Sequence, residues 1–251
     1  MDSWSILAKL SFFRIAYNPF APWPIPANLP LLMPNLNAFL AQAASLTGSV
    51  PSRIANLSTL RELSLAGNYD VIGTIPTELF LLTKLQGLFL SYTLLSGSIP
   101  TEIAQLSKLT HLDLFETVLS GTIPEQLYSG DFNDLFVLDL GANLFSGTIS
   151  KNLSRLWFLG FLYFDTNPKM VGVLPTEIGL LEGLQKFHLH GSSFTGSIPA
   201  ELCDLRNKYL NVLKADCFID SATGEIPLKC DQGCCTKCCD RETGYCENLL
   251  E

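Results

Sequence analysis

The sequence predicts an α/β solenoid, in which short coils of similar sequence stack along one axis, and two observations support this prediction. The first is a repeat of 24 to 26 residues, whose units open at Leu10, Leu36, Leu60, Leu85, Leu109, Leu135, Leu159, Leu184 and Leu210. The second is that the apolar residues of a unit change from a strand-like to a helix-like spacing. A fixed period of this length is typical of repeat proteins, whose units bury their apolar edges against their neighbours.

The unit at 85–109 shows both spacings. Leu88 and Leu90 alternate as on a strand, whereas Ile103 and Leu106 are spaced as on one face of a helical turn. Ordering such a unit costs about 1.5 kcal/mol per residue, which is more than its own apolar side chains recover. We therefore expect the units to fold only as a stack.

A turn with a glycine and an apolar–proline pair joins the two halves of most units. The glycines are Gly48, Gly73, Gly97, Gly121, Gly147, Gly172 and Gly196. The pairs begin at Val50, Ile75, Ile99, Ile123, Leu174 and Ile198, and Ile149-Ser150 is the one break in the series. With the LxxLxLxxN pattern at the start of each unit, these residues resemble the plant-type leucine-rich repeat of receptor ectodomains and secreted recognition proteins. The resemblance covers roughly residues 4–227. It implies a right-handed superhelix with a parallel concave sheet and short 3-10 or α turns on the convex side.

Composition and motifs exclude several classes of function. The formal net charge of −8 argues against a nucleic-acid partner, which would require clustered lysine and arginine. No run of 18 or more apolar residues predicts a membrane span in this chain. The sequence contains none of the common hydrolase, phosphate-binding or dinucleotide-binding motifs. We therefore expect neither catalysis nor a cofactor.

The chain is expected to divide into a solenoid of about nine units at 1–227 and a cysteine-rich cap at 228–251. All eight cysteines lie from position 203 onward: Cys203, Cys217, Cys230, Cys234, Cys235, Cys238, Cys239 and Cys246. An even number in a terminal segment predicts disulfides and an oxidising compartment, although eight cysteines allow 105 pairings. The CCTKCC run resembles the cysteine-rich ends of secreted leucine-rich repeat proteins of microalgae. Cys235 and Cys238 also form a CxxC, which leaves a zinc or iron–sulfur site as the alternative.

The first unit is incomplete, because Met1 falls inside a repeat and no paired cysteines precede it. The end of a solenoid that lacks a capping unit would expose apolar side chains and an unpaired strand to water. We therefore expect an N-terminally truncated chain, whose signal peptide would lie upstream, or a chain whose first edge is covered by a partner.

Side chains alternate along a strand, so the residues beside the buried leucines project from the concave sheet in three columns. The first column is Phe12, Ala38, Glu62, Gly87, His111, Val137, Phe161, Lys186 and Val212. The second is Arg14, Leu40, Ser64, Phe89, Asp113, Asp139, Tyr163, His188 and Lys214. The third is Ala16, Gln42, Ala66, Ser91, Phe115, Gly141, Asp165, His190 and Asp216. All three histidines of the chain lie in these columns.

We predict a ligand-binding surface in the middle of these columns, because aromatic residues surrounded by polar groups are typical of binding hot spots. Its members are Phe89, His111, Asp113, Phe115, Asp139, Phe161, Tyr163, Asp165, His188 and His190. A solvated sheet without a ligand and a metal site at His188 and His190 are the alternatives. The row Asp165–His190–Asp216 predicts raised histidine pKa values and binding that changes between about pH 5 and 7.

Two further patterns concern the hydroxyl residues of the turns and the glycosylation sequons. The residue after each repeat glycine is Ser49, Thr74, Ser98, Thr122, Thr148, Val173 or Ser197. Such a hydroxyl row could order water as in ice-binding solenoids, although small hydroxyl residues are also ordinary at this repeat position. Asn56 and Asn152 begin N-L-S sequons, which predict glycosylation on the convex side of a secreted protein.

The resemblance implies a secreted protein, or one on the extracellular face of the plasma membrane, that recognises a protein or peptide ligand as a receptor-like ectodomain. A co-receptor is a second candidate partner. The alternative function is a secreted inhibitor of a cell-wall-degrading hydrolase, similar to polygalacturonase inhibitors. An intracellular scaffold is a third possibility, and it would leave the cap cysteines as free thiols.

Overall fold

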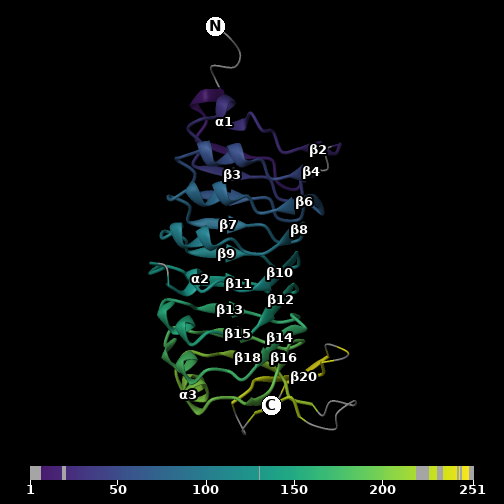
Figure 1. The fold of residues 1–251 in the computed structure, drawn as a ribbon, viewed down its shortest axis with the longest axis vertical. Helices are drawn as coiled ribbons and strands as arrows, with labels where there is room; N and C mark the ends of the chain where they lie inside the picture. Colours follow the sequence, from purple (N-terminus) through teal and green to yellow (C-terminus); the bar gives the residue numbers. More distant parts are fainter. Residues whose placement is uncertain are drawn as a thin grey trace.

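The computed structural model describes residues 7–18, 21–129, 131–218, 226–230, 234–241, 243 and 245–248. It shows an elongated stack of coils, with the first coil at one end and the cysteine-rich segment at the other (Figure 1). The coils form an 11-stranded sheet, an 8-stranded sheet and a 2-stranded sheet. The predicted α/β solenoid is confirmed.

The larger sheet forms the predicted concave face, and each coil contributes one short strand to it. Its strands in spatial order are β1 (Phe12–Arg14), β3 (Ala38–Leu40), β5 (Glu62–Ser64), β7 (Gly87–Phe89), β9 (His111–Asp113), β11 (Val137–Asp139), β13 (Phe161–Tyr163), β15 (Lys186–His188), β18 (Val212–Asp216), β20 (Lys237–Cys239) and β21 (Cys246–Asn248). All neighbours pair in parallel except β20 and β21, which are antiparallel.

A second parallel sheet, which the sequence did not predict, follows the turn after each concave strand. Its strands are β2 (Trp23–Pro24), β4 (Leu46–Ser49), β6 (Asp70–Thr74), β8 (Leu94–Gly97), β10 (Val118–Thr122), β12 (Leu144–Gly147), β14 (Lys169–Gly172) and β16 (Ser193–Phe194). A small separate sheet pairs β17 (Gly196–Ser197) with β19 (Leu228–Lys229). In Figure 1 the two large sheets run side by side along the axis.

Short helical turns line the remaining flank, as the sequence predicted. They are η2 (Leu7–Lys9), α1 (Leu29–Leu32), η3 (Ser52–Asn56), η4 (Thr77–Leu81), η5 (Thr101–Gln105), α2 (Gln126–Ser129), η6 (Lys151–Arg155), η7 (Thr176–Leu180), α3 (Ala200–Asp204) and η8 (Leu205–Asn207). A proline in extended conformation precedes several of them, for example Pro100 before η5. The ring fixes the backbone φ angle and favours the start of a helical turn. No helix in the described part of the chain is long and apolar enough to cross a membrane.

One continuous apolar core runs through the stack between the two sheets and the helical turns. The middle residue of each central concave strand is buried, as Leu88, Leu112 and Leu138 illustrate. Buried asparagines join the coils at the corner after the strand. Asn143 Nδ2 donates to the backbone oxygen of Leu114 on the preceding coil, at 2.7 Å. These bonds satisfy backbone groups that the turn would otherwise leave unpaired.

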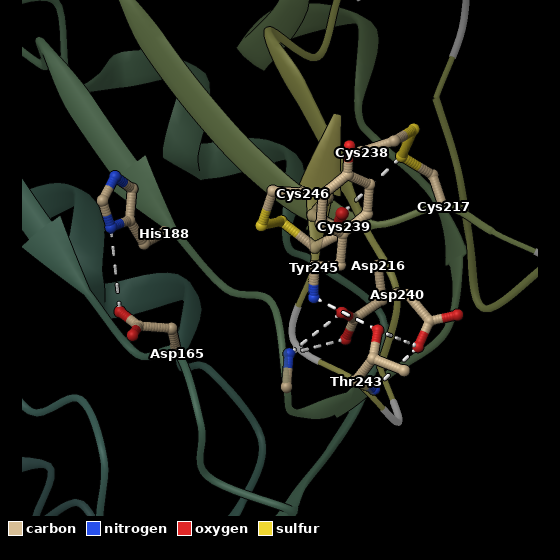
Figure 2. Close-up of a disulfide and its surroundings, with 12 residues drawn as sticks. Asp165, His188, Asp216, Cys217, Cys238, Cys239, Asp240, Thr243, Tyr245 and Cys246 are labelled. Atoms are coloured by element: carbon tan, nitrogen blue, oxygen red, sulfur yellow. Dashed lines mark hydrogen bonds and ion pairs between the residues drawn. A yellow bond between two sulfur atoms is a disulfide. The ribbon is translucent and has the colours of Figure 1, made fainter. Parts of the chain in front are cut away.

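The cap extends the concave sheet, because β20 pairs with β18 and is followed by β21. Four disulfides hold it: Cys203–Cys234, Cys217–Cys238, Cys230–Cys235 and Cys239–Cys246. Figure 2 shows the second and fourth of these bonds. Cys235 and Cys238 have different disulfide partners, so the CxxC offers no thiolate pair to a metal. The predicted division of the chain at residue 227 stays a prediction, since strands from both sides of it join the same sheets.

Candidate ligand-binding face

The structure reproduces the predicted register of the concave columns. His111, Val137 and Phe161 are Cα partners on neighbouring strands, and so are Asp113, Asp139 and Tyr163. The third column continues beyond the strands through backbone hydrogen bonds between successive coils. The ten predicted site residues therefore share one face, and every one of them is partly exposed: Phe89, His111, Asp113, Phe115, Asp139, Phe161, Tyr163, Asp165, His188 and His190.

Three aspartates from successive coils, Asp113, Asp139 and Asp165, lie together at the centre of this face. Asp113 accepts hydrogen bonds from the Ser91 hydroxyl at 2.7 Å and from the Phe115 backbone N–H at 3.1 Å. Asp139 accepts one from the Gly141 N–H at 3.0 Å. None of the three has a lysine or arginine within ion-pair distance among the described residues.

Burial raises the pKa of all three aspartates, because a carboxylate loses hydration inside the face. The effect is largest for Asp139, whose pKa rises to about 7. The hydrogen bond from Gly141 opposes the rise, and the charges of Asp113 and Asp165 add to it. At neutral pH this carboxyl group therefore exists in both protonation states.

The predicted raised histidine pKa values are wrong. His188 Nδ1 lies 3.9 Å from Asp165 Oδ1 (Figure 2). Burial nevertheless lowers the pKa of His188 to about 3, and Lys214 is the next largest cause. Burial also lowers the pKa of His190, although Asp165 opposes the shift. Desolvation of the imidazolium and the nearby lysine charges outweigh the neighbouring carboxylate.

The predicted row of one histidine between two carboxylates does not form either. Asp216 is 2% exposed, and its two carboxylate oxygens accept hydrogen bonds from the backbone N–H of Gly191 at 3.0 and 2.9 Å. Its Oδ2 also lies 3.7 Å from Nε of Arg241 in the cap. Burial raises the pKa of Asp216 to about 6. This aspartate therefore joins the cap to the last coils and is not part of the open face.

Aromatic side chains surround the aspartates on both sides. The ring centroids of Phe89 and His111 are 6.1 Å apart, and those of Tyr163 and His188 are 4.7 Å apart. Nζ of Lys186 lies 5.3 Å from the ring centroid of Phe161. Such pairs are rigid and apolar with polar edges, which suits recognition.

The sequence analysis missed Phe136, which bridges this surface at its edge. Its ring lies 5.1 Å from that of Phe161 and 6.5 Å from that of His111. Phe158 extends the cluster outward and is 47% exposed. The sequence signal for this residue was Gly160, which holds the same repeat position on the next coil. A Cβ at Gly160 would come within 2.2 Å of the Phe136 ring, so the glycine leaves space for that ring. Other units carry polar residues at the position of Phe136, as Gln86 and Thr110 show.

The candidate metal ligands on this face include two cysteines that are not free to bind a metal. His190, Cys239 and Cys246 bring their ligand atoms within 4.8 Å of one another. The two sulfur atoms, however, are bonded to each other. They therefore provide no thiolate, which is the form of cysteine that binds metals.

The predicted hydroxyl row and the two glycosylation sequons lie on other parts of the surface. All seven residues of the predicted hydroxyl row are exposed beside the second sheet, and Val173 interrupts the row. Asn56 is exposed at the end of η3. Asn152 is half-buried, and its Nδ2 donates to Glu125 Oε2 at 3.0 Å. Ice binding and glycosylation both stay predictions.

A family model described as leucine rich repeat matches residues 53–119. Receptor-like protein 39 of Arabidopsis thaliana is 31% identical over 189 residues, which are 74% of this chain and 21% of that protein. This chain thus spans about a fifth of the length of the curated relatives it matches.

Solved receptor structures share the fold over most of the chain. A TDR receptor superposes with a TM-score of 0.72 at 26% identity, covering 85% of this chain and 40% of that one. The Arabidopsis receptor kinase HAESA, in complex with the peptide hormone IDA and the co-receptor SERK1, gives a TM-score of 0.67 at 25% identity. That match covers 95% of this chain and 44% of the receptor.

Proposed function

The chain belongs to the plant-type leucine-rich repeat proteins, and on that basis we propose that it binds a protein or peptide ligand on its concave face. It acts as a receptor-like ectodomain, secreted or held on the extracellular face of the plasma membrane, with a co-receptor as a second partner. The observation that supports this most is the gathering of half-buried aspartates and aromatic rings on one open face.

The energetic cost of that arrangement supports a binding role. Asp113, Asp139 and Asp165 lie on successive coils, where each carboxylate is partly desolvated and Asp139 is repelled by the other two charges. Solvent-exposed charges elsewhere on the surface would keep the protein soluble without this cost. A ligand that hydrogen-bonds to these groups would compensate for the lost hydration.

The comparisons support the class of ligand. HAESA is a receptor kinase with a leucine-rich repeat ectodomain, and its structure contains a peptide hormone and a co-receptor. The four disulfides of the cap are consistent with an oxidising, extracellular compartment.

Tyr163→Ala tests the proposal when it is compared with Tyr209→Ala. Tyr163 lies on the concave face next to His188, whereas Tyr209 is 63% exposed in the loop after η8. Peptides selected from a random display library against the wild-type protein serve as probes. Loss of a central interface tyrosine is expected to weaken their binding by roughly 10- to 30-fold, or about 1.4–2 kcal/mol.

The Tyr209→Ala variant controls for general effects of removing an exposed tyrosine, and we expect it to bind like the wild type. Calorimetric or fluorescence titration of the same peptides measures both effects. Equal affinity of the Tyr163→Ala variant and the wild type for every selected peptide would count against the concave face as the binding site.

A further inference from the structure

The concave face contains a cavity beside the aspartate row, on the coils of β1 to β9. Its volume is about 490 Å³, within the range of roughly 300–1,000 Å³ that is usual for ligand pockets. Phe12, Phe89 and His111 contribute aromatic surface, and Arg61 and Glu62 contribute one charge of each sign. The two charges cancel formally, so the cavity favours a neutral occupant over a strongly charged one.

Two small residues make room for this cavity. Ala38 and Gly87 occupy the first column, where neighbouring coils carry Phe12, Glu62 and His111. A Cβ at position 87 would come within 2.7 Å of Phe89 Cε2. The Phe89 ring therefore leans over the glycine, and any larger residue at position 87 would displace it.

His111 supplies a polar group with a free ring nitrogen. Its Nδ1 lies 2.9 Å from the Thr110 hydroxyl, which orients the imidazole. Its Nε2 has no hydrogen-bond partner among the residues that the structure describes. The Thr110 hydroxyl donates its one proton to the backbone oxygen of Gln86 at 2.8 Å, so it accepts from the His111 Nδ1–H and leaves Nε2 as an acceptor. The ideal ligand group therefore donates a hydrogen bond.

From these contacts we propose that the cavity is the anchor site for a tyrosine side chain of the ligand. The phenol ring packs between the Phe12 and Phe89 rings, and its hydroxyl hydrogen-bonds to His111 Nε2. This inference rests on the proposed function, because it names one residue type of the peptide that the concave face binds. A phenol hydroxyl can donate to this nitrogen from the far end of its ring, whereas an indole N–H projects from the side of a larger ring system and a phenyl ring has no donor.

The size of the cavity fits a tyrosine within a longer chain. An aromatic ring alone fills only part of about 490 Å³, which leaves space for the adjoining peptide units. Asn37, Gln86 and Thr110 lie one residue before their concave strands and also border the cavity. The side-chain amides of Asn37 and Gln86 can pair with the backbone of that peptide.

N-acetyl-tyrosinamide, N-acetyl-tryptophanamide and N-acetyl-phenylalaninamide are the probes that test this assignment. Titrations followed by NMR on isotope-labelled protein report binding at the Ala38 and Thr110 methyl groups. We expect the tyrosine derivative to bind about 3- to 10-fold more tightly than the phenylalanine derivative, because one hydrogen bond separates them. His111→Phe keeps an aromatic wall and should abolish that difference. Phe12→Ala should weaken all three probes, and Tyr209→Ala should change nothing.

Two results would overturn the anchor site. One is equal affinity of the wild type for the tyrosine and phenylalanine derivatives, and the other is no response of the Ala38 and Thr110 signals up to the solubility limit of the probes. Either result leaves the proposed function intact if the selected peptides still depend on Tyr163. Loss of that dependence, in contrast, refutes the proposed function without reference to the cavity.

Discussion

The two large sheets come from the same coils, yet they carry different side chains. The concave sheet presents aspartates, histidines, lysines and aromatic rings. The second sheet and the residue after each of its glycines present serines and threonines beside exposed apolar side chains such as Leu94, Val118 and Leu144. Within the repeats both sheets pair their strands in parallel along the same axis, so stacking alone does not explain the difference. The comparison indicates that close packing restricts the glycine positions of the second sheet, whereas the concave face is free to vary along its whole length and can be used for recognition.

Backbone geometry explains the restriction of the second sheet. Gly97 and Gly172 have φ angles of +84° and +93°, which side chains with a Cβ rarely adopt. A Cβ at Gly97 would come within 3.1 Å of Thr74 Cγ2 on the preceding coil. A side chain is therefore disfavoured at these glycine positions, where successive coils approach closely.

The largest predicted effect is on the concave sheet, where Asp139→Asn should stabilise the protein at pH 8. The asparagine Oδ1 can still accept the Gly141 N–H, while the cost of desolvating a charge disappears. The pKa of Asp139 rises from 3.8 to about 7, so we expect a gain of about 2–4 kcal/mol in the free energy of unfolding. Denaturant unfolding at pH 8 measures it.

The difference in stability between this variant and the wild type should depend on pH. The folded protein binds the Asp139 proton more tightly than the unfolded chain, so the wild type loses stability as the pH rises from about 4 to about 7. The advantage of the Asp139→Asn variant should therefore shrink from pH 7 towards pH 4. His188, with a pKa lowered to about 3, destabilises the fold as the pH falls below 6.5, but it does so in both proteins. A difference that is independent of pH would contradict the desolvation of Asp139.

The second effect in size is on the second sheet, where Gly172→Ala should destabilise the protein by about 1–3 kcal/mol. The φ angle of +93° disfavours alanine, and its Cβ would approach Thr148 Cγ2 to 2.9 Å. Gly183→Ala is the matched control, because its Cβ would meet only the Leu159 backbone oxygen, at 3.5 Å. Thermal or denaturant unfolding should separate the two variants, and equal stability would remove the packing explanation.

The smallest effect is expected for Thr148→Val, which removes one hydroxyl from the exposed row. Because Thr148 is exposed and the new side chain has a similar shape, the free energy of unfolding should stay within about 0.5 kcal/mol of the wild type. Peptide affinity should not change. If the variant lost peptide binding or an ability to shape ice crystals, the hydroxyl row would have a function of its own.

The fold and the concave columns could be predicted because the repeat fixes the register. Once Leu112 and Leu138 are placed in the core, His111, Asp113, Val137 and Asp139 must face outward. That argument requires only sequence spacing and the alternation of side chains along a strand.

The electrostatics could not be predicted in the same way, because the pKa of a histidine depends on its burial as well as on its neighbours. Lys237 lies on β20 in the cap, where no repeat pattern places it, yet its charge helps to lower the pKa of His188. The Asp216 carboxylate accepts hydrogen bonds from the Gly191 N–H and lies beside Arg241 of the cap, so it does not pair with His190. Sequence spacing places a side chain on a face, but it does not show which hydrogen bonds it makes.

Hydrogen exchange with a bound peptide tests the central comparison most directly. The probe is the tightest peptide from the display selection, and exchange is followed at the backbone amides of both sheets. The account predicts slower exchange in and beside β9, β11 and β13, with no change in β8, β10 and β12. Slower exchange confined to the second sheet would contradict it, because the face restricted by packing would then be the one that binds.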